Sequence, residues 1–274
     1  MLVAAHPDRL WGFASVDPQV SGAADELERA FTELGAKGLC LHPAKQGFAP
    51  DDAVAEPLYE LCERYNKPVV FHAGMSWEPG AELSRSNPLA FEHTIATHPN
   101  VRFSLTHFGW PWVRETVAML LKYPNCYTDT SITYIDSPEE MMQRLFTVDM
   151  GPLWYERALS HQVMFASNTP RFRAFKLKRA LDTVSMRDDA RERLYWVMPC
   201  VFLKGMSEHG DARDIELSLD CSGPVHRYYR RRARRRRTQL GDEWLGSDYF
   251  VAYDLRNRGK RGAALRGDGS YGDA

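Results

Sequence analysis

Five polar side chains follow or end short apolar runs in this 274-residue sequence. His42 follows Leu-Cys-Leu, His72 follows Val-Val-Phe, and His107 follows Ser-Leu-Thr. Asp129 lies within Tyr-Thr-Asp-Thr-Ser, and Asn168 follows Met-Phe-Ala-Ser. Neutral imidazole is a common ligand for zinc and also the usual general acid or base near neutral pH. Either use requires several such groups at one place, so the chemistry depends on the elements that position them.

The apolar runs alternate with helix-like segments in a repeated βα pattern. The strand-like runs are 12–16, 38–43, 69–74, 102–109, 126–131 and 163–168, and helix-like segments are 23–38, 56–68 and 114–124. Runs that are apolar on both faces predict a parallel sheet covered by helices, in a doubly wound sheet or a barrel. Ligands bind at the carboxyl ends of such strands, so we expect the three histidines to point into one cleft.

Each of these residues also has a structural interpretation. A single histidine at a strand end is more often a hydrogen-bonded structural residue than a ligand. For His42 we favour the structural role, because the proline that follows it suggests a turn. For Asp129, a turn or capping role is as well supported as a role in a site. His93 and His98 lie in a helical stretch, and we expect them at the surface.

Five segments carry a resemblance to a known family. They are 37–52, 67–74, 98–112, 123–131 and 163–172. In this order and spacing they resemble the signature segments of the amidohydrolase-2 family, which includes aminocarboxymuconate-semialdehyde decarboxylase and resorcylate-type decarboxylases. The resemblance covers about residues 6–205. It implies an α/β fold, a (β/α)8 TIM barrel, and a divalent metal, usually zinc and sometimes manganese.

The resemblance also implies roles for single residues. His72 matches the metal ligand on a middle strand, and His107 matches the histidine that acts near the metal as general acid or base. Asn168 stands where the family carries a metal-binding aspartate. The implied activity is that of a metal-dependent hydrolase or non-oxidative decarboxylase. Its substrate would be a small carboxylated molecule, aromatic or ring-derived, and a homodimer would suit this family.

Three departures from the family pattern support an alternative. The sequence has no His-x-His pair for a first strand, and its asparagine is neutral where the family has a carboxylate. There are six strand-like runs where the barrel needs eight, so we expect a barrel that lacks its first strands. The alternative is therefore a catalytically inactive barrel fragment or pseudoenzyme with a scaffold or partner-binding role.

The composition changes after about residue 205. We therefore divide the chain into an incomplete barrel, 1–205, and a low-complexity tail, 206–274, expected to be disordered except for a short piece at 243–255. Residues 227–237 include eight arginines, for which we favour a solvated charge run over nucleic-acid binding. Before the tail, Pro199 is expected to disrupt the helix-like segment 191–205.

Net charge, apolar runs and cysteine spacing indicate which partners and which cell compartment to expect. The formal net charge of -1 gives no reason to expect nucleic acid or a charged membrane surface as a partner. The sequence has no apolar run of about 18 residues and no pattern typical of a signal peptide. Its five cysteines show no C-x-x-C spacing. We expect a cytoplasmic protein with reduced thiols and a small-molecule substrate.

Overall fold

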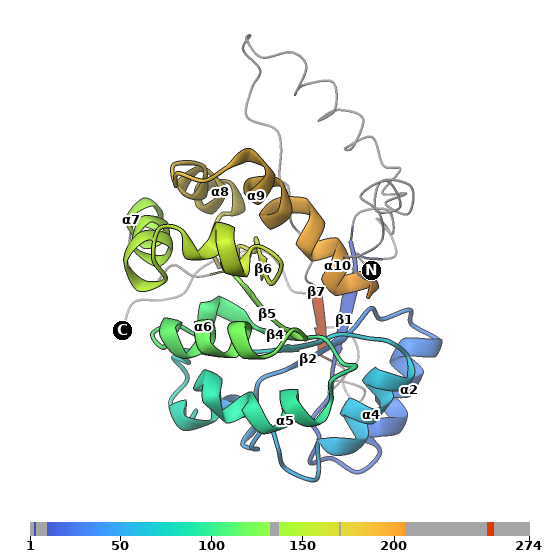
Figure 1. Cartoon of the computed structure of the whole chain (residues 1–274). Coiled ribbons are helices and arrows are strands. Elements are labelled where there is room, and N and C mark those ends of the chain that lie inside the picture. Colours follow the sequence, from blue (N-terminus) through green and yellow to red (C-terminus); the bar gives the residue numbers. More distant parts are fainter. Residues whose placement is uncertain (1–2, 4–9, 132–136, 170, 206–250, 255–274) are drawn as a thin grey trace, which may run out of the picture.

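A seven-stranded parallel sheet forms the centre of the protein (Figure 1). A computed structural model describes residues 3, 10–131, 137–169, 171–205 and 251–254. The strand order is β6-β5-β4-β3-β2-β1-β7, and every neighbouring pair is parallel. The strands are β1 (Gly12–Ser15), β2 (Leu39–Leu41), β3 (Val69–Phe71), β4 (Phe103–Leu105), β5 (Cys126–Asp129), β6 (Val163–Met164) and β7 (Val251–Asp254).

All six strand-like runs of the sequence contain a strand, so the predicted parallel sheet is confirmed. The seventh strand, β7, pairs with β1 and falls within 243–255, the one piece of the predicted tail for which the sequence allowed local order. The other residues of the predicted tail, including the arginine run, lie outside the described residues. Among the described strands, β6 and β7 are the two ends of the sheet.

Helices follow the strands, as the βα pattern predicts. The α-helices are α2 (Ala23–Thr32), α3 (Pro43–Gln46), α4 (Glu56–Arg64), α5 (Glu92–Thr97), α6 (Val113–Lys122), α7 (Pro138–Arg144), α8 (Ala174–Asp182), α9 (Asp188–Glu192) and α10 (Met198–Lys204). The 3-10 helices are η1 (Leu83–Ser86), η2 (Pro88–Phe91) and η3 (Thr106–Gly109), and the π-helices are η4 (Leu145–Asp149), η5 (Tyr155–Leu159) and η6 (Arg193–Val197). None of the helices in the described ranges combines the length and apolar character required to cross a membrane.

The two faces of the sheet bury different sets of side chains. One face packs against the helices that follow the strands, with α2, α4 and α5 together on that side (Figure 1). The opposite face packs against α10. This second core contains Phe13, Val70, Tyr127 and Met164 from four strands, together with Met198, Val201 and Phe202 from α10. Alternation along each strand separates the two sets.

The helical segment that ends the described barrel region accommodates Pro199 without breaking. α9 continues into the π-helix η6, and α10 begins at Met198 with the proline in its first turn. A proline cannot donate a backbone hydrogen bond to the preceding turn, and the wider π turn precedes it directly. The predicted disruption is therefore a local change of helix type.

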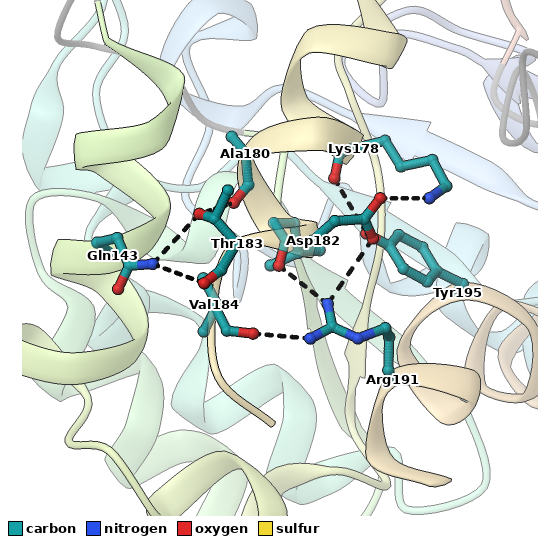
Figure 2. A network of polar contacts seen from close by, with 9 residues as sticks. Gln143, Lys178, Ala180, Asp182, Thr183, Val184, Arg191 and Tyr195 are labelled. Atoms are coloured by element: carbon teal, nitrogen blue, oxygen red, sulfur yellow. Dashed lines mark hydrogen bonds and ion pairs between the residues drawn. The ribbon is translucent and has the colours of Figure 1, made fainter. Parts of the chain in front are cut away.

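A network of polar contacts joins α7, α8 and the segment α9–η6 (Figure 2). Arg191 donates to the carbonyl oxygens of Leu181 at 3.0 Å and Val184 at 2.7 Å, at the end of α8. Asp182 accepts from the Tyr195 hydroxyl at 2.9 Å and pairs with Lys178 at 2.7 Å. A cation that binds the last carbonyls of a helix satisfies acceptors that have no partner within the helix.

Replacing Arg191 by methionine is expected to destabilise the protein by about 1–3 kcal/mol, because two carbonyl groups lose a charged donor. The control is Arg179→Met on α8, the helix whose end Arg191 contacts from α9, since Arg179 is exposed. Urea-unfolding curves of the two variants measure the difference. Equal midpoints for Arg191→Met and Arg179→Met would show that the network does not contribute.

Candidate active site at the carboxyl ends of the strands

His42 and His72 reach one place because their strands are in register. Cys40 on β2 lies opposite Val70 on β3, and each histidine follows two residues later. Residues two apart point to the same face of a sheet, so both imidazoles extend beyond the face that α10 covers. The two rings stack with their centroids 3.8 Å apart and an interplanar angle of 11°.

His107 joins them through an unusual backbone turn. Strand alternation after Ser104 would point Thr106, and not His107, toward this face. The chain instead enters the left-handed region at His107 (φ 61°) and Phe108 (φ 51°) within η3. As a result, His107 Nε2 lies 3.2 Å from His72 Nδ1. The three histidines thus lie together, as expected, with His72 in contact with both of the others.

The hydrogen-bond partners of His72 and His107 assign the hydrogen on each ring. His107 Nδ1 lies 2.6 Å from the carbonyl oxygen of Ser131, and His72 Nε2 lies 3.2 Å from that of Met75. A carbonyl oxygen can only accept, so each of these nitrogens carries the hydrogen and donates it. With each outer nitrogen donating in this way, the facing nitrogens of the neutral rings, His72 Nδ1 and His107 Nε2, carry no hydrogen.

Desolvation keeps the three imidazoles neutral at pH 7. Burial lowers the pKa of His107 to about 4, and it lowers the pKa of His72, whose ring is packed between the other two, to about 3. The pKa of His42 falls to about 4, mainly through burial and then through the nearby His72. The positive charge of Arg171 also acts on His72 and His107 and lowers both pKa values further.

Asp129 supports the turn that carries His107. Its Oδ1 accepts from the His107 backbone N–H at 3.1 Å and from the Ser131 backbone N–H at 3.0 Å. The Ser131 hydroxyl also donates to this oxygen in a short hydrogen bond. Of the two roles considered for Asp129, the turn role matches these contacts. Burial raises the pKa of this carboxyl, while the donors from Ser131 and His107 oppose that change.

Asn168 lies at the same edge of the sheet but in a different setting. It follows β6, is exposed, and has a left-handed backbone (φ 55°), a conformation that asparagine tolerates better than most residues. Its carbonyl oxygen accepts from Phe172 N at 3.3 Å and closes a turn. In the described part of the chain, no hydrogen bond joins its side chain to the histidines.

Structural roles were predicted for His42, His93 and His98, and the structure tests each of them. His42 caps α3, since its Nδ1 accepts from the backbone N–H of Lys45 at 3.2 Å, as the structural role predicts. His93 is exposed, as expected. The surface role predicted for His98 is wrong, because this side chain is buried and its ring nitrogens contact Thr94 O at 3.0 Å and Glu56 Oε1 at 2.9 Å.

Two residues near the histidines were not singled out from the sequence. Ser131 ends the Asp-Thr-Ser segment, and its position two residues after Asp129 was the available signal. Arg171 lies in the loop between β6 and α8, three residues after Asn168. In the sequence, it is one of several arginines, and nothing distinguishes it from Arg173.

Known proteins of similar sequence place the chain in a family. The family described as Amidohydrolase matches residues 1–196. Among curated proteins, the protein fluG of Emericella nidulans is 38% identical over 64 residues, which is 23% of this chain and 7% of that protein. The matching part is therefore a small fraction of the length of this curated relative.

Solved structures share the fold at low sequence identity. An uncharacterized TIM-barrel protein, Bb4693 from Bordetella bronchiseptica, is similar with a TM-score of 0.60 at 20% identity, over 74% of this chain and 69% of its own. A dihydroxybenzoic acid decarboxylase from Polaromonas sp. JS666, with bound manganese and the inhibitor 2-nitroresorcinol, has a TM-score of 0.54 at 17% identity, over 75% and 73%. Both support the predicted barrel-type α/β fold. Because the family match covers residues 1–196 of 274, the chain belongs to the amidohydrolase family.

Proposed function

We propose that the protein is a metal-dependent hydrolase or decarboxylase that acts on a small carboxylated substrate. The observation that carries this proposal is the approach of two ring nitrogens, His72 Nδ1 and His107 Nε2, to 3.2 Å, with the ring hydrogens assigned to the outer nitrogens. Two lone pairs at this distance repel each other. A divalent cation bound at His72 Nδ1 removes the repulsion, because it takes up one lone pair and attracts the other.

The residues present fit a metal in part. Imidazole must be neutral to bind a metal, and the low pKa of His72, about 3, meets that requirement at pH 7. Its Nε2–H is oriented by the Met75 carbonyl, as is usual for a ligating histidine. No group of three or more His, Cys, Asp or Glu side chains within the described ranges is arranged to hold a metal. The family resemblance, and not a contact among the described residues, is the basis on which we assign Asn168 as a further ligand and zinc or manganese as the metal.

Two different side chains would hold the metal and move the proton. When bound, the metal would act as a Lewis acid on a substrate oxygen. His72 would hold it through Nδ1. His107 Nε2 is unprotonated and close enough to accept a proton from water in hydrolysis or to give one to the substrate carbon that loses CO2, after prior protonation. This step uses His107 as the general acid or base.

Arg171 is the group that we assign to the substrate carboxylate. Its positive charge is among the causes that lower the pKa of both His72 and His107. Lys45, whose backbone N–H donates to His42, is paired with Glu78 at 3.5 Å. Among the described residues, no carboxylate forms an ion pair with Arg171. A guanidinium can bind a carboxylate through two hydrogen bonds. This arrangement favours an anionic substrate.

Purified protein loaded with Mn²⁺ or Zn²⁺ and offered a panel of hydroxybenzoic acids tests the proposal. We expect about one metal per chain by elemental analysis and metal-dependent release of CO2 or of a hydrolysis product from carboxylated esters and amides. Protein that binds neither metal and converts none of these compounds would instead support the inactive barrel with a scaffold role.

Replacing Arg171 by glutamine is expected to raise KM for a carboxylated substrate by roughly 10–100-fold, because a charge-assisted hydrogen bond of about 1.5–3 kcal/mol is lost. Arg173→Gln is the matched control, since Arg173 is an exposed arginine of the same loop. Steady-state kinetics on both variants measure the effect. An unchanged KM for Arg171→Gln would remove Arg171 from the proposed site.

A further inference from the structure

We infer that Asp129 and Ser131 form a lock that fixes the tautomer and direction of His107, so that its Nε2 is the nitrogen free to handle a proton. Ser131 is the positioning residue of this lock, and Asp129 holds Ser131. The purpose of the lock rests on the proposed function, because a fixed tautomer matters where His107 moves a proton.

The order of donors and acceptors in this cluster has one consistent solution. The Ser131 hydroxyl donates to Asp129 Oδ1, so its hydrogen is not available to His107. The serine oxygen can then accept from His107 Nδ1, at 2.8 Å, while the Ser131 carbonyl accepts from the same nitrogen at 2.6 Å. Both partners of Nδ1 are acceptors, so the hydrogen of the neutral ring stays on Nδ1.

The same carboxylate fixes the backbone on which the ring stands. Asp129 Oδ1 accepts from His107 N at 3.1 Å and from Ser131 N at 3.0 Å. His107 has a left-handed backbone, which costs free energy in a residue with a side chain and persists only when surrounding contacts support it. Asp129, His107 and Ser131 are all buried, so these hydrogen bonds are not weakened by competing water. One carboxylate therefore sets the position of the ring, and the serine sets its tautomer.

Ser131, which follows β5, is needed because the tautomer of His107 decides whether His72 Nδ1 is available. Without Ser131, rotation of the His107 ring or transfer of its hydrogen to Nε2 would direct an N–H at His72 Nδ1, 3.2 Å away. That hydrogen bond would occupy the nitrogen that we assign to the metal. By holding the hydrogen on Nδ1, the lock keeps both facing nitrogens available.

Long-range ¹H–¹⁵N correlation spectra of the full-length ¹⁵N-labelled protein test this inference directly, because the ring ¹⁵N shifts distinguish Nδ1–H from Nε2–H. The His107 signals are assigned by their loss in His107→Gln. We expect the Nδ1–H tautomer in the wild-type protein without added metal. An Nε2–H tautomer would overturn the inference, even if the protein is an active metalloenzyme.

The matched variants are Ser131→Ala and Ser104→Ala. Both remove a buried hydroxyl, but that of Ser104 has no hydrogen-bond partner among the described residues. Ser131→Ala leaves the carbonyl as the one remaining acceptor of the His107 Nδ1–H. We expect this variant to give a mixture of His107 tautomers and to lower kcat at least about 10-fold, and Zn²⁺ affinity should fall with it because an Nε2–H would occupy His72 Nδ1. Ser131→Thr should restore the single tautomer, and Ser104→Ala should leave the spectrum unchanged.

The outcomes separate the lock from the proposed function. Retention of the pure Nδ1–H tautomer in Ser131→Ala would overturn the role of Ser131. If the tautomer responds as expected but the wild-type protein converts no substrate and binds no Zn²⁺, the lock is supported and the proposed function fails.

Discussion

Replacing His72 by alanine is expected to lower the affinity for Zn²⁺ or Mn²⁺ more than about 100-fold, because loss of a ligand should exceed the 10–100-fold effect of losing a group that orients one. Turnover should fall to background in the same variant. The physical reason is the position of His72 between the other two imidazoles, with Nδ1 unprotonated and 3.2 Å from His107 Nε2. Removing the ring would leave the proposed metal site without the nitrogen that we assign to the metal.

Two controls distinguish this effect from a general loss of histidine. His93→Ala removes an exposed imidazole from α5 and should change neither metal affinity nor turnover. His42→Asn replaces the cap of α3 by another good capping residue and should keep most of the metal affinity. Isothermal titration with each metal measures all three variants. Unchanged affinity in His72→Ala would remove this residue from the metal site.

Replacing Gly74 by alanine is expected to lower the free energy of unfolding by about 2–6 kcal/mol. Part of this, about 1–3 kcal/mol, is the strain of a left-handed backbone in a residue with a side chain, since Gly74 has φ +92°. The rest, again about 1–3 kcal/mol, is overpacking. A Cβ atom at this position would lie 2.5 Å from the carbonyl oxygen of Trp110 and 2.8 Å from the carbonyl carbon of Gly109.

The clash falls where two loops of the site meet. Gly74 follows His72 by two residues, and Gly109 follows His107 by two residues. Met75 N donates to Trp110 O at 2.7 Å, so the loops are joined directly beside the glycine. Pushing them apart should therefore also separate the two facing imidazole nitrogens. Turnover should fall together with stability.

Gly80→Ala is the matched control for this substitution. Gly80 has nearly the same backbone angle, φ +88°, but a Cβ atom there would meet nothing within 4 Å. Only the backbone strain remains, so we expect a loss of about 1 kcal/mol. Guanidinium-unfolding curves compare the two variants. Equal losses would show that the close approach of the two loops does not limit stability.

The strands and two of the three site histidines could be predicted from local pattern. A run such as Val69–Phe71 is apolar on both faces, which a parallel sheet requires. Because parallel strands end at one edge, His42 and His72 had to approach each other once β2 and β3 paired in register. Family resemblance then suggested the roles of His72, His107 and Asn168, which remain proposals.

Other features depended on contacts between segments distant in the sequence. The surface position predicted for His98 was wrong because its helix packs with one face inward and Glu56, 42 positions earlier, accepts its Nε2–H. The segment 191–205 was predicted to be disrupted at Pro199, and tertiary packing instead retained a helix by widening one turn. Local propensity is overridden where burial of an apolar face gives more free energy.

The amino-acid sequence by itself determined the order of the strands and helices and the polar residues that end each strand, because the hydrophobic period and the turn residues are local properties. Only the tertiary structure decided which nitrogen of His107 is free. That depends on a left-handed turn and on Asp129 and Ser131, which lie 22 and 24 positions further along the chain. Hydrogen bonds between neighbouring strand ends set this chemistry, and no pattern within one segment contains them.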